Sequence, residues 1–295
     1  MKTCRLQHKA LSLSFAALFA VAGIFALCAS LRPASAHAAA QEIYYCDTYY
    51  TGANYGGGGL REDGEYIYRD SYTVGENYRV AQAPSYGSDN QSVQNYCAVS
   101  AGRNIVVYYD RAFPDLIPGF EPGVSAGGQY IYLPDLGYEE TEEVFDILYD
   151  EMKTNVGGAG TSGTNFKNGL KTYAQDRGYS LSYSSFYEDR ENVDLAAFED
   201  AIDAGKVGVL LLTKYNFIYS IDHGSGSTYL DRWISDIAHI MMVYGYITVR
   251  YYDNGSLIGT DTFLQASSGF NTADQGYIRM DDYLQIEEAL IVNVS

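Results

Sequence analysis

The order of hydrophobic patterns along residues 97–294 constrains the fold more than any other feature of this sequence. Four segments have the apolar spacing and boundary residues of helices: 97–110, 139–155, 164–177 and 194–204. The apolar or alternating segments that follow are typical of strands: 207–212, 237–252, 260–267 and 286–294. Asp253, Asn254 and Gly255 favour a hairpin between two of these strands, and residues 113–134, rich in Gly and Pro, are expected to form a loop. Helices that precede antiparallel strands predict an α+β fold with an N-terminal helical half and a C-terminal antiparallel β half.

Residues 1–38 have the pattern of a secretory signal peptide. A basic start precedes an apolar run from Ala10 to Leu31, and small residues at cleavage spacing follow it. The alternative is an uncleaved membrane anchor, because the run is nearly long enough to cross a bilayer. The serines and the glycine within the run favour cleavage. We therefore expect a secreted, extracellular protein that has no membrane association after signal cleavage.

Residues 39–85 form an N-terminal extension that is rich in Tyr and Gly, and the sequence leaves three interpretations of it open. It is a removed pro-region, a segment that wraps the main domain, or a set of additional strands of the main sheet. Residues 66–68 and 78–80 indicate short strands, whereas the glycine run at 56–59 indicates a flexible break. The main domain is expected to span residues 86–295.

The net charge excludes one class of partner. The chain carries −18, and this becomes about −22 without residues 1–38, which hold four basic residues and no acidic ones. A protein that binds nucleic acid needs a basic surface, so we expect no nucleic-acid partner. Acidity of this size favours solubility, and a preference for basic substrates is the alternative. The sequence predicts no oligomeric state.

Cys97 and His239 are the candidate nucleophile and base. Cys97 opens the first predicted helix, where backbone N–H groups and the helix dipole favour a thiolate. His239 lies on a later predicted strand, and a thiol beside an imidazole is an activated nucleophile. His223, in an expected Gly-Ser loop, is the alternative base. A disulfide between Cys46 and Cys97 is the alternative to catalysis, because secretion permits such bonds.

The sequence lacks the motifs of other catalytic or metal centres. It has no H-E-x-x-H, no paired C-x-x-C, no G-x-S-x-G and no phosphate-binding loop. The segment from Asp222 to Asp231 has oxygen donors without the spacing of a calcium loop. We therefore expect no cofactor and no metal.

The chain resembles the papain-like cysteine peptidases on two motifs. The first is Q-x5-C at Gln91 and Cys97, and the second is H-x5-G-Y at His239, Gly245 and Tyr246. It is similar in particular to secreted bacterial members that resemble bacteriocin-leader-processing peptidases. In these, N-x-C-x-x-x-[SA]-G recurs together with a helical motif that matches residues 164–179 here. The resemblance covers about residues 86–295.

This resemblance implies a papain-like fold, in which the helical half carries the Cys97 helix and the β half carries His239. It also implies a secreted thiol peptidase that hydrolyses peptide or protein substrates through a thioester intermediate. In this family Cys97 would be the nucleophile and His239 the base and acid, while Gln91 and the N–H of Cys97 would hold the oxyanion. Non-catalytic extracellular binding, with Cys46 bridged to Cys97, is one alternative function. A cell-wall amidase or acyl transferase on the same fold is another.

The sequence departs from the family at the residue that orients the histidine. The family places Asn or Asp after the strand that follows the histidine. Ser267 falls nearest to that position here, with Gln265 on the same strand and Asn271 just beyond. We assign the orienting role to Ser267. The alternatives are a shifted alignment or an inactive homologue.

Overall fold

The computed structural model describes residues 42–50, 59–61, 71–79, 83–87, 94–121, 123–126, 129–133, 138–224, 227–253, 255–270 and 273–295. All of them belong to one compact unit, residues 39–295. The predicted signal peptide, residues 1–38, lies outside the described residues. Within the ranges given above, no helix is both long enough and apolar enough to cross a membrane.

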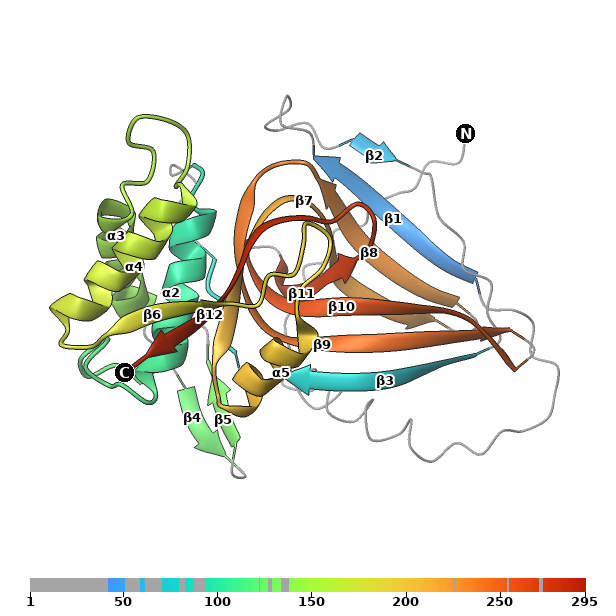
Figure 1. Ribbon diagram of the computed structural model, residues 1–295, viewed down its shortest axis with the longest axis horizontal. Helices are drawn as coiled ribbons and strands as arrows, with labels where there is room; N and C mark the ends of the chain where they lie inside the picture. Colours follow the sequence, from blue (N-terminus) through green and yellow to red (C-terminus); the bar gives the residue numbers. More distant parts are fainter. Residues whose placement is uncertain are drawn as a thin grey trace. The chain divides into compact units, whose positions relative to one another are not determined.

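The fold is α+β, as the sequence predicts. Helices α2 (Cys97–Asp110), α3 (Tyr138–Glu151) and α4 (Gly163–Asp176) contact one another, and α5 (Leu195–Asp203) packs on the strands instead (Figure 1). A hairpin of β4 (Gly123–Ala126) and β5 (Gln129–Tyr132) interrupts the segment expected as a loop. The four helices therefore lie where their sequence patterns place them.

The ends of the helices follow from local chemistry. The side chain of Ser162 caps α4 by accepting a hydrogen bond from the N–H of Asn165, at 3.1 Å, and Asp194 caps α5 in the same way. Helix α3 ends at Glu151, four residues before its predicted end at Asn155. The reason is that Lys153 and Asn155 adopt positive φ angles, which a right-handed helix does not allow.

The long strand β7 (Val207–Gly224) organises the β half. Its residues 207–212 pair with both β9 (His239–Asp253) and β12 (Gln285–Val294), and its later part pairs with β8 (Ser227–Ser235) and β11 (Ala273–Met280). Because β10 (Ser256–Phe270) joins β9 to β11, the strands β7, β11, β10 and β9 form a closed ring (Figure 1). The loop expected around His223 is wrong, since His223 is a strand residue paired with Thr228. A further strand, β6 (Leu181–Ser185), pairs with β12.

The N-terminal extension contributes strands to the same sheet. Strand β1 (Glu42–Tyr50) pairs in parallel with β8, β2 (Gly59–Arg61) pairs with β1, and β3 (Ser71–Arg79) pairs antiparallel with β9. Of the three interpretations that the sequence left open, the structure therefore has additional strands of the main sheet. The strand predicted at residues 66–68 lies outside the described residues.

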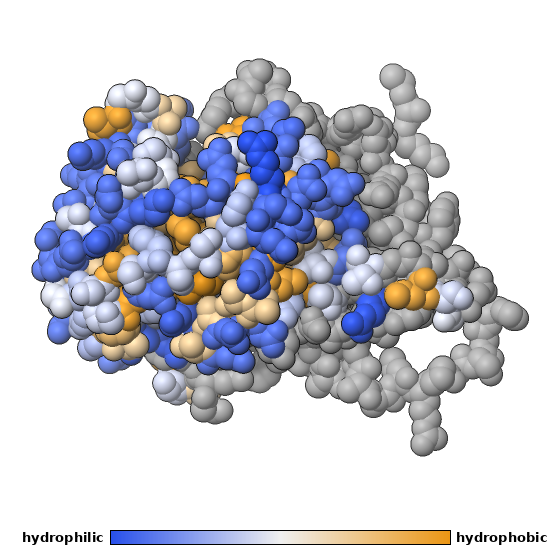
Figure 2. Space-filling view, viewed as in Figure 1, coloured by the Kyte–Doolittle hydropathy of each residue, from blue (hydrophilic) through white to orange (hydrophobic). Residues whose placement is uncertain are grey.

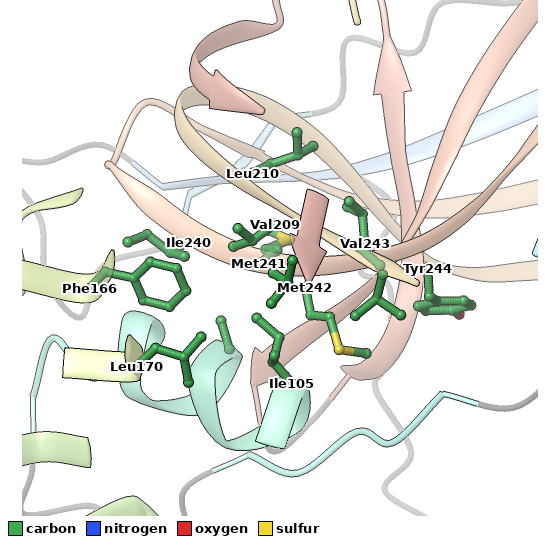
Figure 3. Packing of buried hydrophobic residues seen from close by; sticks show 14 of the residues in the cluster. Ile105, Phe166, Leu170, Val209, Leu210, Ile240, Met241, Met242, Val243 and Tyr244 are labelled. Carbon is green, nitrogen blue, oxygen red and sulfur yellow. The ribbon is translucent and has the colours of Figure 1, made fainter. Parts of the chain in front are cut away.

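The hydrophobic core joins the helical half to the β half. Side chains from α2, α4, β7 and β9 converge on it, among them Ile105, Phe166, Val209 and Met242 (Figure 3). Residues 240–244 of β9 are all buried, although successive side chains of a strand point to opposite faces. Strand β9 is therefore covered on both faces, and this holds its first residue, His239, beside α2.

The described part of the face drawn in Figure 2 is mostly polar. Figure 2 shows hydrophilic side chains over most of the coloured part of one face, with small hydrophobic areas between them. Among the described residues, the large apolar side chains with high exposure are scattered along the chain: Val124, Val156, Tyr187 and Leu257. Scattered apolar side chains of this kind are normal for a protein surface and need no partner to cover them.

Candidate active site

Cys97 is the first residue of α2, at a helix end that no side chain of the described residues caps. The residue at the cap position is Tyr96. The first N–H groups of a helix have no acceptor within the helix, and the dipole adds a partial positive charge there. The N–H of Ala98 bonds to the sulfur of Cys97. An uncapped helix end costs about 1 kcal/mol relative to a capped one, and here the N–H of Ala98 at this end bonds to the thiol instead.

His239 opens β9 and lies beside Cys97. His239 is 7% exposed, and its ring tilts against the buried ring of Tyr215, with centroids 5.7 Å apart. Nε2 lies 2.9 Å from the backbone carbonyl oxygen of Ser268. Because a carbonyl oxygen only accepts, Nε2 carries a proton and donates it in this hydrogen bond. Nδ1 is thus the nitrogen left for the hydrogen bond between His239 and Cys97.

The two side chains shift each other's pKa toward the ionised pair. Burial alone would raise the pKa of Cys97, but the charge and hydrogen bond of His239 outweigh it, together with the N–H groups of Ile240 and Ala98. The pKa of Cys97 therefore falls below its ordinary value. Burial lowers the pKa of His239, but the thiolate of Cys97 and the Ser268 carbonyl together raise it by more, so the net shift is upward. A thiolate beside an imidazolium is the state that these shifts favour.

The carbonyl of Ser268 reaches His239 because β10 ends against α2. The next residue, Gly269, has φ = 73°, and a β-carbon placed there would lie 3.0 Å from the β-carbon of Ser100. Ser100 is one helical turn after Cys97. Only glycine fits both this conformation and this close approach. The turn at Gly269 therefore holds the acceptor for His239 within reach of the ring.

Ser267 does not have the position that we predicted for it. Its hydroxyl donates to the carbonyl oxygen of Pro84, at 2.6 Å, and the acceptor at Nε2 of His239 is the backbone of the following residue. Side chains of a strand alternate between faces, so Ser267 points to the 83–87 segment rather than to the ring. A backbone carbonyl has no residue-type signal. The only signal in the sequence was the glycine after the two serines, which marks a bend in the chain.

The structure describes some of the other residues that the sequence analysis singled out and leaves others undescribed. Gln91 and Asn271 lie outside the described residues, and Gln265 is buried on β10. Cys97 is a free cysteine in the structure. Cys46 lies on β1, paired in register with Asp231 of β8.

The helical motif at residues 164–179 contributes packing rather than chemistry. Phe166, Leu170 and Tyr173 are fully buried, and the hydroxyl of Tyr173 donates to the carbonyl of Leu116 at 2.9 Å. A β-carbon at Gly169 would lie 2.7 Å from the backbone nitrogen of Met152, so this glycine lets α4 approach the end of α3. The motif thus fixes the helices that support α2.

No group of three or more His, Cys, Asp or Glu side chains is placed to hold a metal ion in the part of the chain that the structure describes. The groups that the structure does bring together at the site are the thiol of Cys97, the imidazole of His239 and the N–H groups of Ala98 and Ile240.

Comparisons with known proteins give no family. No protein-family model matches the chain, and no curated protein matches it. Among solved structures, it has a slight similarity to a Ralstonia eutropha JMP134 protein with a provisional DNA-binding description. The two share 11% identity with a TM-score of 0.19 over 40% of this chain and 75% of that one. A likeness of this size supports no statement about fold or function.

Proposed function

We propose that this protein is a secreted cysteine peptidase with a papain-like arrangement, in which Cys97 is the nucleophile and His239 is its base and acid. The observation that carries the proposal is the hydrogen-bonded pair itself. His239 is buried against Cys97 through one ring nitrogen, and its other nitrogen donates to Ser268 at 2.9 Å. A base held by a third group next to a nucleophile is the arrangement that nucleophilic catalysis requires.

The origin of the two residues supports the papain-like arrangement. Cys97 comes from the first turn of a helix in the helical half, and His239 comes from the first residue of a strand in the β half. The site lies where α2 meets β9 and the end of β10. The resemblance in the motifs of residues 86–295 agrees with this placement.

Acylation begins with the thiolate of Cys97. Its sulfur attacks the carbonyl carbon of the scissile peptide bond and forms a tetrahedral oxyanion. The imidazolium of His239 then donates the Nδ1 proton to the leaving amine, so the C–N bond breaks and a thioester remains. The pKa shifts described above supply both partners in the charge states that this step needs.

The oxyanion is stabilised by donors at the start of α2. The backbone N–H of Cys97 has no acceptor within the helix and lies beside the reacting sulfur. Gln91 is the proposed second donor, from the segment that leads into the helix. One donor of this kind contributes roughly 3 kcal/mol of transition-state stabilisation.

Deacylation regenerates the thiolate–imidazolium pair. Neutral His239 takes a proton from water, whose oxygen attacks the thioester carbonyl, and the C–S bond breaks to release the acid. The Ser268 carbonyl holds the ring in the same position for both proton transfers. The products are one carboxylic acid and one amine, and one water molecule is consumed.

The test is hydrolysis of fluorescein-labelled casein by the secreted protein and its variants. Cys97→Ala should lower hydrolysis by about 10⁴-fold or more while the protein stays folded. Cys46→Ser is the matched control, because it removes the other cysteine of residues 39–295. Its activity should equal that of the wild type. Hydrolysis that survives in Cys97→Ala would overturn the proposal.

A second arm separates the alternatives. His239→Ala should abolish hydrolysis, whereas His223→Ala should not, since His223 lies on the β7–β8 hairpin. Wild-type protein that is inactive on casein but releases amine from peptidoglycan fragments would make it a cell-wall amidase with the same Cys97 chemistry. Mass spectrometry that finds Cys97 joined to Cys46 in the unreduced, inactive protein would favour the binding protein.

A further inference from the structure

Two turns with unusual backbone conformations meet next to Cys97. One contains Asn95, with φ = 60°, and the other contains Lys153 and Asn155, with φ = 51° and 61°. Across the described ranges of the chain, these are the only non-glycine residues with positive φ. Such conformations are unfavourable for residues with a side chain and gather at functional sites. Their concentration on both sides of one contact points to a constraint on that contact.

The side chain of Asn155 connects the two turns. Its Oδ1 accepts hydrogen bonds from the N–H of Gly160, at 2.8 Å, and from Nδ2 of Asn95, at 3.2 Å. Its Nδ2 donates to the carbonyl oxygen of Gln94, at 2.8 Å, and to the hydroxyl of Tyr149, at 2.9 Å. Both donors and both acceptor sites of the amide are therefore in use.

Each end of this network is itself anchored. The backbone N–H of Asn155 donates to the carbonyl of Gly160 at 2.9 Å, which closes the turn of residues 155–160. Tyr149 lies on α3, with its ring stacked on buried Phe145. Asn155 is thus fixed to the helical half by Tyr149 and Gly160, independently of its contacts with Gln94 and Asn95.

The contact controls the direction in which the chain enters α2. The two proposed oxyanion donors are the N–H of Cys97 and the side chain of Gln91. Gln94 is three residues before Cys97 and three residues after Gln91. The carbonyl that Asn155 holds belongs to the peptide unit between Gln94 and Asn95, so its rotation would turn the backbone on both sides. Two donors aimed at one oxygen must keep their relative positions to act together.

We propose that Asn155 is a positioning residue for the chain that leads into Cys97, whose backbone N–H is an oxyanion donor. The inference rests on the proposed function and deepens it. Asn155 acts through Gln94 and Asn95 and does not contact the sulfur or the ring of His239 in this role. Its loss should therefore impair stabilisation of the tetrahedral intermediate and leave formation of the thiolate intact.

Asn155→Asp is the sharpest test. Aspartate keeps an oxygen for the Gly160 N–H and for Asn95, but its second oxygen faces the carbonyl of Gln94 where the amide donated a hydrogen bond. Asn155→Gly is the second variant. It keeps the positive φ without strain and removes the side chain, so it remains informative if the aspartate variant fails to fold. Val156→Ala is the matched control, because Val156 is in the same turn and is 72% exposed.

The measurements are kcat and KM for fluorescein-labelled casein, and the rate of iodoacetamide labelling of Cys97 at pH 5. We expect both Asn155 variants to lose about 10- to 100-fold in kcat with little change in KM, because small misplacements of catalytic groups cost rate. Labelling at pH 5 should stay within about twofold of the wild type, since it requires only the thiolate. Val156→Ala should match the wild type in all three.

Other results overturn the inference. Unchanged kcat in both folded variants would show that Asn155 positions nothing for catalysis. Parallel losses of kcat, labelling and thermal stability would make its role purely structural. A wild-type protein that labels rapidly at pH 5 but hydrolyses no casein would overturn the proposed function, and the inference with it.

Discussion

Nε2 of His239 lies 2.9 Å from the backbone carbonyl oxygen of Ser268. A main-chain acceptor at this place has a consequence for mutagenesis, because no side-chain substitution at Ser268 removes it. The orientation of the base depends instead on the path of the chain through Ser267, Ser268 and Gly269. A substitution along this path should therefore affect the proposed activity only when it moves the Ser268 carbonyl, whatever the polarity of the new side chain.

Ser267→Ala should keep its activity. The Ser267 hydroxyl donates to Pro84 and not to the ring, so its loss removes one buried hydrogen bond, worth about 1 kcal/mol of stability. Urea unfolding should show that loss, and kcat for casein should stay within about twofold of the wild type. A kcat lower by a hundredfold would mean that the hydroxyl, and not the carbonyl, orients His239.

Gly269→Ala should impair catalysis. The added methyl group would meet Ser100 at 3.0 Å in a backbone conformation that alanine rarely adopts, so the Ser268 carbonyl must move. We expect kcat to fall by about tenfold or more, with slower labelling of Cys97 at pH 5. Gly255→Ala is the control, since Gly255 has φ = 76° but nothing within 4 Å. Equal kcat in the two variants would contradict the positional argument.

The pH dependence of the reaction should follow the ionised pair. The pKa of Cys97 is lowered and that of His239 is raised, so the thiolate–imidazolium pair exists between the two apparent values. kcat/KM should rise as pH passes the lower value and fall as it passes the upper one. In His239→Ala the charge and hydrogen bond of the imidazole are lost, and the N–H groups of Ile240 and Ala98 alone oppose the effect of burial. The pKa of Cys97 should therefore rise relative to the wild type, and iodoacetamide labelling should shift to higher pH. Labelling at pH 5 that persists in this variant would contradict the pairing.

Asp110 should make the protein less stable as pH rises. Burial raises its pKa to about 7, although the N–H of Ile117 donates to its Oδ1 at 2.7 Å. Because the folded pKa lies above the unfolded one, the stabilising contribution is complete below pH 4 and is lost as pH rises toward 7. With allowance for the solvent near the group, the loss is on the order of 2 kcal/mol.

The check is urea unfolding at pH 5 and pH 8 for the wild type and Asp110→Asn. Asparagine keeps the acceptor for Ile117 and carries no charge, so the pH-dependent loss due to this group should vanish in the variant. An equal loss in both proteins would assign the effect to other groups.

Gly169→Ala should destabilise the helical half. A β-carbon there would lie 2.7 Å from the backbone nitrogen of Met152 and 2.9 Å from the carbonyl carbon of Glu151, and backbone atoms cannot rotate away. Overpacking of this kind costs about 1–3 kcal/mol, measured as a lower denaturation midpoint. Gly158→Ala, with nothing within 4 Å, is the control and should be neutral or slightly stabilising. Equal midpoints for the two variants would contradict the close approach of α3 and α4.

Local pattern predicted much of the secondary structure. The helix from Cys97 to Asp110 has the bounds that its apolar periodicity indicates. The strand predicted at 237–252 from its alternating pattern is present and runs from His239 to Asp253. The strand at 207–212 was recognised only in its most apolar part. Its polar continuation to Gly224 has no such pattern, because its partners β8 and β11 define it.

The sequence by itself determined that Cys97 starts a helix and that His239 lies on a later strand, and therefore which thiol and which imidazole are available for a site. These are properties of neighbouring residues, expressed through apolar periodicity and helix-end preferences. Only the tertiary structure decided that the Ser268 carbonyl accepts from His239, that Ser267 contacts Pro84, and that Asn155 holds Gln94. Each of these contacts involves a backbone carbonyl. All residues have that group alike, so its partner depends on where the chain is brought by packing and not on residue type.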